Sequence, residues 1–161
     1  MSLARTDVRQ HLDKILSEES QLLAELQAVL ESETGIVSSD DADAIARIGN
    51  NRQRCVDRLT RLGQERNDTS RMLSFGSDAA GLDRLFEWAD PSRTLRARWS
   101  ANLELARRCK ALNDRNGAIV TAKLDRVQQL LRKLRGTHAP VVYSARASRY
   151  ANLGSRDLGC A

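Results

Sequence analysis

The sequence predicts an all-α protein: an elongated antiparallel three-helix bundle of long helices, with a short extra helix and a flexible C-terminal tail. Aromatic residues make up only 4% of the 161 residues, while leucine, alanine and arginine abound, which favours helix over sheet. The two prolines, Pro91 and Pro140, stand beside predicted helix boundaries and leave long helices uninterrupted. Apolar residues recur at steps of three and four over long stretches, as amphipathic helices require.

The first helix is predicted over residues 6–33. Glu19 occupies a position of its apolar stripe, and it either faces water at a local gap or pairs with a basic group. We expect Gly35 to end the helix. The stripe consists of Val8, Leu12, Ile15, Leu22, Leu26 and Val29.

The second helix is predicted to begin at a capping box formed by Ser38 and Asp41 and to end near Phe75 and Gly76. Arg52 interrupts its apolar stripe early. The stripe consists of Ile45, Ile48, Cys55, Leu59, Leu62, Met72 and Leu73.

A short helix is predicted between Ser77 and Asp90, where Leu82, Leu85 and Phe86 begin an i, i+3, i+4 pattern. We expect it to fold over one end of the bundle.

The third long helix is predicted to start at the Asp90-Pro91 pair and to reach Arg135, just before Gly136. Its roughly 45 residues extend about 65 Å, so we expect the two earlier long helices to lie alongside it. Its stripe consists of Leu95, Trp99, Ala106, Cys109, Val120, Val127, Leu131 and Leu134. The bundle domain is therefore predicted over residues 1–136, and the tail over residues 137–161.

Charge is divided unequally along the chain. Residues 1–90 contain 11 basic and 17 acidic side chains, whereas residues 91–161 contain 15 and 4. Acidic first helices packed against a basic last helix would favour the bundle and leave a positive face for an acidic partner. The alternative is a solvated, arginine-rich helix face.

No pattern for catalysis, cofactor binding or metal binding is present. The three cysteines are far apart, and we expect Cys55 and Cys109 in the core and Cys160 as an exposed thiol. Nucleotide-binding, nucleophile-elbow and metalloprotease motifs are missing. We therefore expect no enzyme, no cofactor, no small-molecule substrate and no stable membrane insertion, and a cytoplasmic location.

The third long helix carries polar and small residues on or beside its apolar stripe: Asn102, Asn113, Asn116 and Gly117. Buried amides cost free energy unless paired, and glycine in a helix costs about 1 kcal/mol relative to alanine. One interpretation is that the asparagines fix the helix register while Gly117 allows close helix approach. The other is a docking notch for a partner helix.

These residues carry a resemblance to the FlgN family of flagellar type III export chaperones. The most specific stretch runs over residues 99–120, followed by a leucine-rich run to Gly136 and by Tyr143. The motif residues are Trp99, Asn102, Cys109, Asn113, Asn116 and Gly117. The resemblance implies a helical chaperone whose partners are hook-filament junction proteins and the flagellar export apparatus.

We expect the client to bind at the end of the third long helix and the tail, through apolar area and basic charge. The alternatives are a homo-oligomeric coiled-coil scaffold and, less favoured, a basic protein that binds nucleic acid. The predicted client-binding residues are Leu130, Leu131, Arg132, Lys133, Leu134, Arg135, Val141, Val142, Tyr143, Tyr150 and Leu153.

Overall fold

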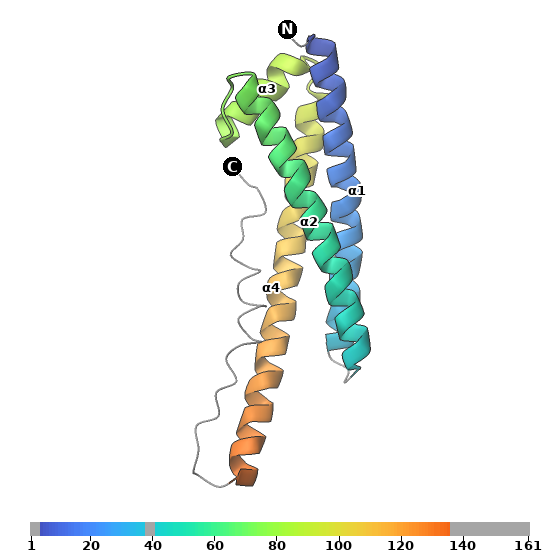
Figure 1. Ribbon diagram of the computed structural model, residues 1–161, viewed down its shortest axis with the longest axis vertical. Coiled ribbons are helices and arrows are strands. Elements are labelled where there is room, and N and C mark those ends of the chain that lie inside the picture. Colours follow the sequence, from blue (N-terminus) through green and yellow to red (C-terminus); the bar gives the residue numbers. More distant parts are fainter. Residues whose placement is uncertain (1–3, 38–40, 136–161) are drawn as a thin grey trace.

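The computed structural model describes residues 4–37 and 41–135, and the regular structure within these residues is helical (Figure 1). The helices are α1 (Arg5–Val37), α2 (Ala42–Met72), α3 (Ala79–Ala89) and α4 (Thr94–Arg135). The prediction of three long helices and a short one is confirmed. Residues 137–161, predicted as the tail, lie outside the described residues.

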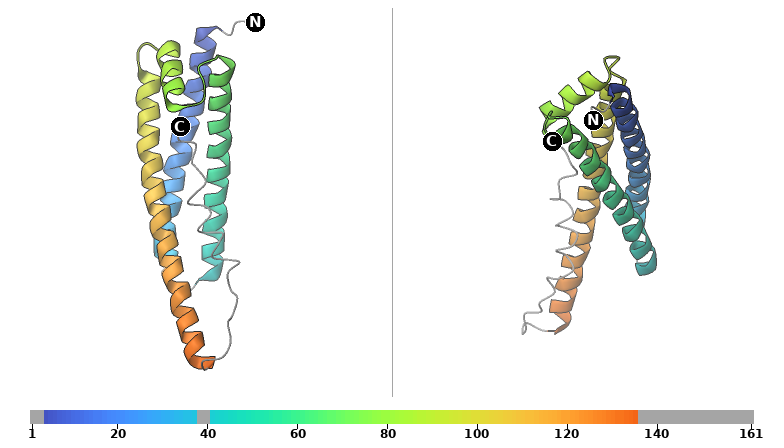
Figure 2. Two further views of the ribbon diagram at one scale, coloured as in Figure 1. Left: turned by 90° about the vertical axis from the view of Figure 1, so that its left-hand side faces the viewer. Right: turned by 45° about the horizontal axis from the view of Figure 1, so that its top comes forward.

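Helix α1 joins the other two long helices. It packs against both α2 and α4, whereas over their described lengths no Cα atom of α2 lies within 8 Å of one of α4. Helix α2 runs opposite to α1, and α4 runs in the same direction as α1 (Figures 1 and 2). Consecutive long helices therefore alternate in direction, as predicted.

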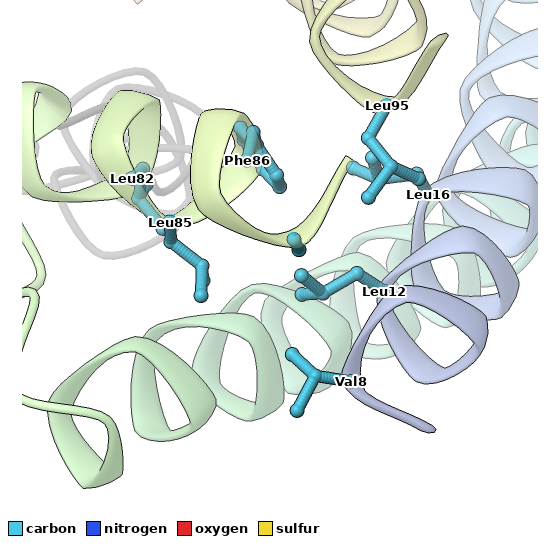
Figure 3. Packing of buried hydrophobic residues seen from close by; sticks show 8 residues of the cluster. Val8, Leu12, Leu16, Leu82, Leu85, Phe86 and Leu95 are labelled. Carbon is cyan, nitrogen blue, oxygen red and sulfur yellow. The ribbon is translucent and has the colours of Figure 1, made fainter. Parts of the chain in front are cut away.

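Helix α3 closes the end of the bundle at which α1 begins. Its N-cap residue Asp78 accepts a hydrogen bond from the backbone N–H of Gly81 at 2.8 Å. Apolar side chains of α3 point toward α1 and the start of α4 (Figure 3). Burying each such side chain contributes about 1.5–3 kcal/mol, which fixes α3 across this end. The cluster consists of Val8, Leu12, Leu16, Leu82, Leu85, Phe86, Ala89 and Leu95.

A second apolar cluster joins all three long helices near their middle. It contains Leu23, Leu26 and Leu30 of α1 together with Cys55 of α2 and Cys109 of α4. Both thiols are free and buried, which confirms that they are core residues. Burial raises the pKa of the Cys109 thiol to about 11 and also raises the pKa of Cys55. Both therefore stay neutral at physiological pH.

The start of α2 differs from the predicted capping box. The N-cap residue is Asp41, whose carboxylate accepts a hydrogen bond from the backbone N–H of Ala44 at 2.9 Å. Residue 38 lies outside the described residues, and Asp41 takes the role that the prediction gave to Ser38. The helix ends at Met72, a few residues before the predicted Phe75 and Gly76.

Gly35 does not end α1, and that prediction is wrong. The helix continues to Val37, because Glu33 and Val37 are buried on the same packed face and hold the last turn in place. A Cβ atom added to Gly35 would meet no other atom within 4 Å. The glycine is therefore tolerated within the helix and does not act as a cap.

The third long helix also begins later than predicted. Pro91 lies in the turn before it, Arg93 has a positive φ of 63°, and α4 starts at Thr94. Asp90 still serves the helix start, since its Oδ2 accepts a hydrogen bond from the backbone N–H of Leu95 at 3.0 Å. The Asp90-Pro91 signal thus predicted the right helix but misplaced its first turn.

Candidate functional site

Three side chains of α4 make the same kind of hydrogen bond to the backbone of α1. The donor is a side-chain atom of α4, the acceptor is a main-chain carbonyl of α1, and the partners are 86 residues apart in each case. Because the donors are one heptad apart, the two parallel helices are held in a fixed heptad register. Asn102, Cys109 and Asn116 donate to Leu16, Leu23 and Leu30 at 3.0, 3.5 and 2.9 Å, respectively.

Asn102 belongs to a buried polar layer that joins the three long helices. The Ser20 hydroxyl donates to Asn102 Oδ1 at 2.6 Å. Glu19 forms a buried ion pair with Arg66 of α2, whose guanidinium lies 4.0 Å from the ring centroid of Trp99. Burial raises the pKa of Glu19 above its ordinary value, and the positive charge of Arg66 offsets only part of this rise. Glu19 therefore pairs with a basic group, one of the two outcomes predicted for it.

Asn116 belongs to a second polar layer, two heptads further along. The Thr34 hydroxyl donates to Asn116 Oδ1 at 2.6 Å, and Asn116 Nδ2 also donates to Glu33 Oε2 at 3.1 Å. Arg52 of α2 pairs with Glu33 Oε1 at 2.7 Å. Arg52, which interrupts the predicted stripe, is thus the buried partner of Glu33. The two layers repeat the same arrangement of glutamate, arginine, asparagine and hydroxyl.

Two other residues of the family motif do not take part in these layers. Asn113 is half-buried, and its side chain makes no hydrogen bond with another described residue. A Cβ atom added to Gly117 would meet no atom within 4 Å, so the interpretation that Gly117 allows close helix approach is wrong. The docking notch stays a prediction.

The pairing of α4 with α1 stops before α4 does. Helix α1 ends at Val37, and the 86-residue offset places Val37 level with Lys123 of α4. Residues 124–135 extend past the end of α1 as about three helical turns (Figures 1 and 2). We call residues 124–135 the α4 overhang. The expectation that the two earlier helices lie alongside the whole of this helix is wrong here.

The α4 overhang carries a stripe of exposed apolar side chains. Their three- and four-residue steps place them on one face of α4, in line with the face that contacts α1. Their exposed fractions are 40% for Leu124, 52% for Val127, 53% for Leu130, 39% for Leu131 and 82% for Leu134. Val127, Leu131 and Leu134 belong to the predicted apolar stripe of this helix, and none of the other described helices covers them.

The overhang is also strongly basic. It contains Arg126, Arg132, Lys133 and Arg135, against the single acidic residue Asp125. The side chains of residues 126, 132 and 133 are exposed, and no ion pair within the described residues joins them to a carboxylate. The overhang therefore combines an uncovered apolar face with uncompensated positive charge.

The structure brings together part of the predicted client-binding set. Leu130, Leu131, Leu134, Arg132 and Lys133 lie on the overhang with exposed side chains, and Arg135 is its last residue. Sequence reasoning missed Leu124 and Val127 as site residues. One sequence signal could have found them: this helix is predicted to be longer than the two earlier long helices, so its end would extend past them. The remaining predicted residues, Val141, Val142, Tyr143, Tyr150 and Leu153, lie outside the described residues.

Neither a metal-ligand cluster nor a membrane-spanning helix is found within residues 4–37 and 41–135. No group of three or more His, Cys, Asp or Glu side chains gathers there in an arrangement that could hold a metal ion. None of the helices in these residues combines the length and apolar character that a membrane span needs. The overhang is thus the feature of the described chain that most needs a functional explanation.

A family model described as FlgN protein matches residues 1–150 of the chain. The match spans all four helices and includes the whole overhang. Neither curated proteins nor solved structures yield a match.

Proposed function

The chain belongs to the FlgN family of flagellar export chaperones, and we propose that it binds hook-filament junction proteins in the cytoplasm. It shields the aggregation-prone helical ends of these clients, prevents their premature assembly, and delivers them to the flagellar export apparatus. It acts by binding alone, without a cofactor or nucleotide hydrolysis.

The exposed apolar stripe of the α4 overhang is the observation that supports this proposal. Single exposed apolar side chains are common, but a contiguous row of them on one helix face is typical of a binding surface, and Leu130 and Leu134 in this row are more than half exposed. An amphipathic client helix that lays its apolar face on this stripe removes that area from water. The overhang is then the client-binding surface.

The tail contributes to the same surface in this proposal. Val141, Val142, Tyr143, Tyr150 and Leu153 add apolar contacts that follow the overhang directly in the chain. Deleting residues 137–161 should preserve helicity, measured by circular dichroism, because the four helices do not include these residues. Client binding should weaken at least tenfold, and unchanged affinity would show that the tail is not part of the site.

Isothermal titration of the purified chain with purified hook-filament junction proteins tests the function. The proposal predicts saturable binding and a complex of defined size by light scattering. A homo-oligomeric scaffold would instead form large assemblies without a client. A nucleic-acid-binding protein would bind DNA or RNA tightly and lose that affinity steeply with salt. Either result, without client binding, would contradict the proposed function.

A further inference from the structure

We infer that the segment held by the α4 overhang is an acidic amphipathic helix that lies along the continuation of α1. This inference rests on the proposed function for the identity of the client, and it adds the chemistry and the placement of the bound segment. It follows from the register of α4 with α1 and from the charge of the overhang.

The placement follows from the contact face of α4. Up to Lys123, this face meets α1 in a parallel heptad register fixed by Asn102 and Asn116. Beyond Lys123 the same face continues with Val127, Leu130 and Leu134, where α1 has ended. A helix that covers this face occupies the space where further turns of α1 would lie. To cover the overhang it needs about 12 residues, or about 18 Å.

The chemistry follows from the charges beside the stripe. Arg126 and Lys133 are one heptad apart and lie along the same edge, one turn before and one turn after Leu130. Upstream on α4, two of the exposed cations, Arg107 and Lys110, pair with acidic side chains of their own helix. The cations Arg126 and Lys133 of the overhang have no such partners among the described residues. Glutamates or aspartates that flank the client's apolar face would supply the acidic partners.

The same charge disfavours a second copy of this chain as the occupant. Two overhangs that pair through their stripes bring the exposed cations Arg126 and Lys133 of each copy to one interface. Like charges at an interface weaken association unless acidic groups compensate for them, and Asp125 is the single acidic residue of the overhang. An acidic helix from another protein meets no such repulsion.

The test uses two synthetic amphipathic peptides of about 18 residues with identical leucines at three- and four-residue spacing. One has glutamate and the other lysine at the positions that flank the leucines. Fluorescence anisotropy measures their binding to the full chain. We expect the glutamate peptide to bind at least tenfold more tightly, with an affinity that falls as salt rises. Equal binding of the two peptides would overturn the inference.

Charge reversal on the chain localises the effect. The triple variant Arg126→Glu, Arg132→Glu, Lys133→Glu should weaken binding of the glutamate peptide at least tenfold. The control carries the same charge change on exposed, heptad-spaced positions of α2, and should alter binding less than twofold. Equal effects of the two variants would show general electrostatic attraction and overturn the inference. The control substitutions are Arg47→Glu, Arg54→Glu and Arg61→Glu.

Failure of this inference can be told from failure of the proposed function. If junction proteins bind but overhang charge reversal leaves their affinity unchanged, the chaperone function stands and the acidic-helix inference falls. If the glutamate peptide binds at the overhang but no junction protein binds, the proposed function falls and the inferred chemistry stands. Sedimentation that shows a dimer dissociated by Leu131→Ser would identify a second copy as the occupant and overturn the inference.

Discussion

Asn102 and Asn116 lie two heptads apart on α4, and each donates a hydrogen bond to a carbonyl of α1, at 3.0 and 2.9 Å. Each also accepts a hydrogen bond from a hydroxyl of α1, at 2.6 Å in both cases. Sliding α4 by one turn along α1 would break both sets of bonds and leave buried amides unpaired. The two asparagines therefore set the register of α4 along α1, and with it the point at which α4 extends past the end of α1.

Replacing Asn116 by alanine should lower the free energy of unfolding by about 1–3 kcal/mol, because buried groups of Leu30, Thr34 and Glu33 lose a partner. Urea denaturation measures the change. Asn113→Ala is the matched control on the same helix, and it should cost less than about 0.5 kcal/mol. Equal costs for the two variants would contradict the register role of Asn116.

The ion pair between Glu33 and Arg52 should behave as a unit. Arg52→Met alone leaves a carboxylate that is 2% exposed without its cation, and should cost about 3 kcal/mol or more. The double variant Glu33→Met, Arg52→Met removes both charges, and we expect it to be more stable than the Arg52→Met single variant. A double-mutant cycle in urea measures the coupling. Strictly additive losses would mean that the pair does not act as a unit.

Much of this fold follows from periodicity, and the helix boundaries show why the rest does not. Three- and four-residue spacing predicts each helix because one face of each is buried. Glycine and proline signals are local, and packing overrides them: Gly35 stays helical because Val37 beyond it is buried. Pro91 precedes α4 by a full turn because Arg93 takes a positive φ. The pairing of Glu19 with Arg66 depends on helix register, which a single sequence does not define.

Acid should destabilise the protein partly through Asp90. The Ser92 hydroxyl and the backbone N–H of Leu95 donate to its carboxylate and lower its pKa to about 2. A depressed carboxyl pKa in the folded state stabilises the fold above the ordinary pKa near 4, and this contribution is lost as pH falls toward 2.

The variant Asp90→Asn should therefore be less stable than wild type at pH 7, and the difference should shrink between pH 4 and pH 2. Urea midpoints across this range measure it. Glu19 acts in the opposite direction, since its raised pKa favours the fold at lower pH, but its contribution is common to both proteins. A difference that stays constant with pH would contradict the role of the Asp90 carboxylate.

Gly117→Ala should raise the free energy of unfolding by up to about 1 kcal/mol, because the added Cβ meets no atom within 4 Å and alanine is the better helix former. Gly81→Ala is the contrasting variant, since its Cβ would collide with the carbonyl oxygen of Phe75 and destabilise the start of α3. Thermal unfolding separates the two. If Gly117 forms a docking notch, the alanine variant should also bind the client more weakly.

The site was only partly predictable from sequence. The leucines and basic residues at the end of the third long helix are visible in the sequence, and periodicity shows that they share a face. Periodicity does not show what covers that face. Val127 and Leu130 continue the stripe that contacts α1, and only the end of α1 at Val37 reveals that they are left exposed.

Isothermal titration of a hook-filament junction protein into overhang variants tests the central claim most directly. The variant Leu130→Ser, Leu131→Ser, Leu134→Ser removes apolar area worth about 1 kcal/mol per leucine, so client affinity should fall about a hundredfold. The control Met72→Ser changes a residue that is 71% exposed at the end of α2, and its affinity should stay within twofold of wild type. Wild-type affinity in the triple variant, with helicity unchanged, would contradict the overhang as the client-binding surface.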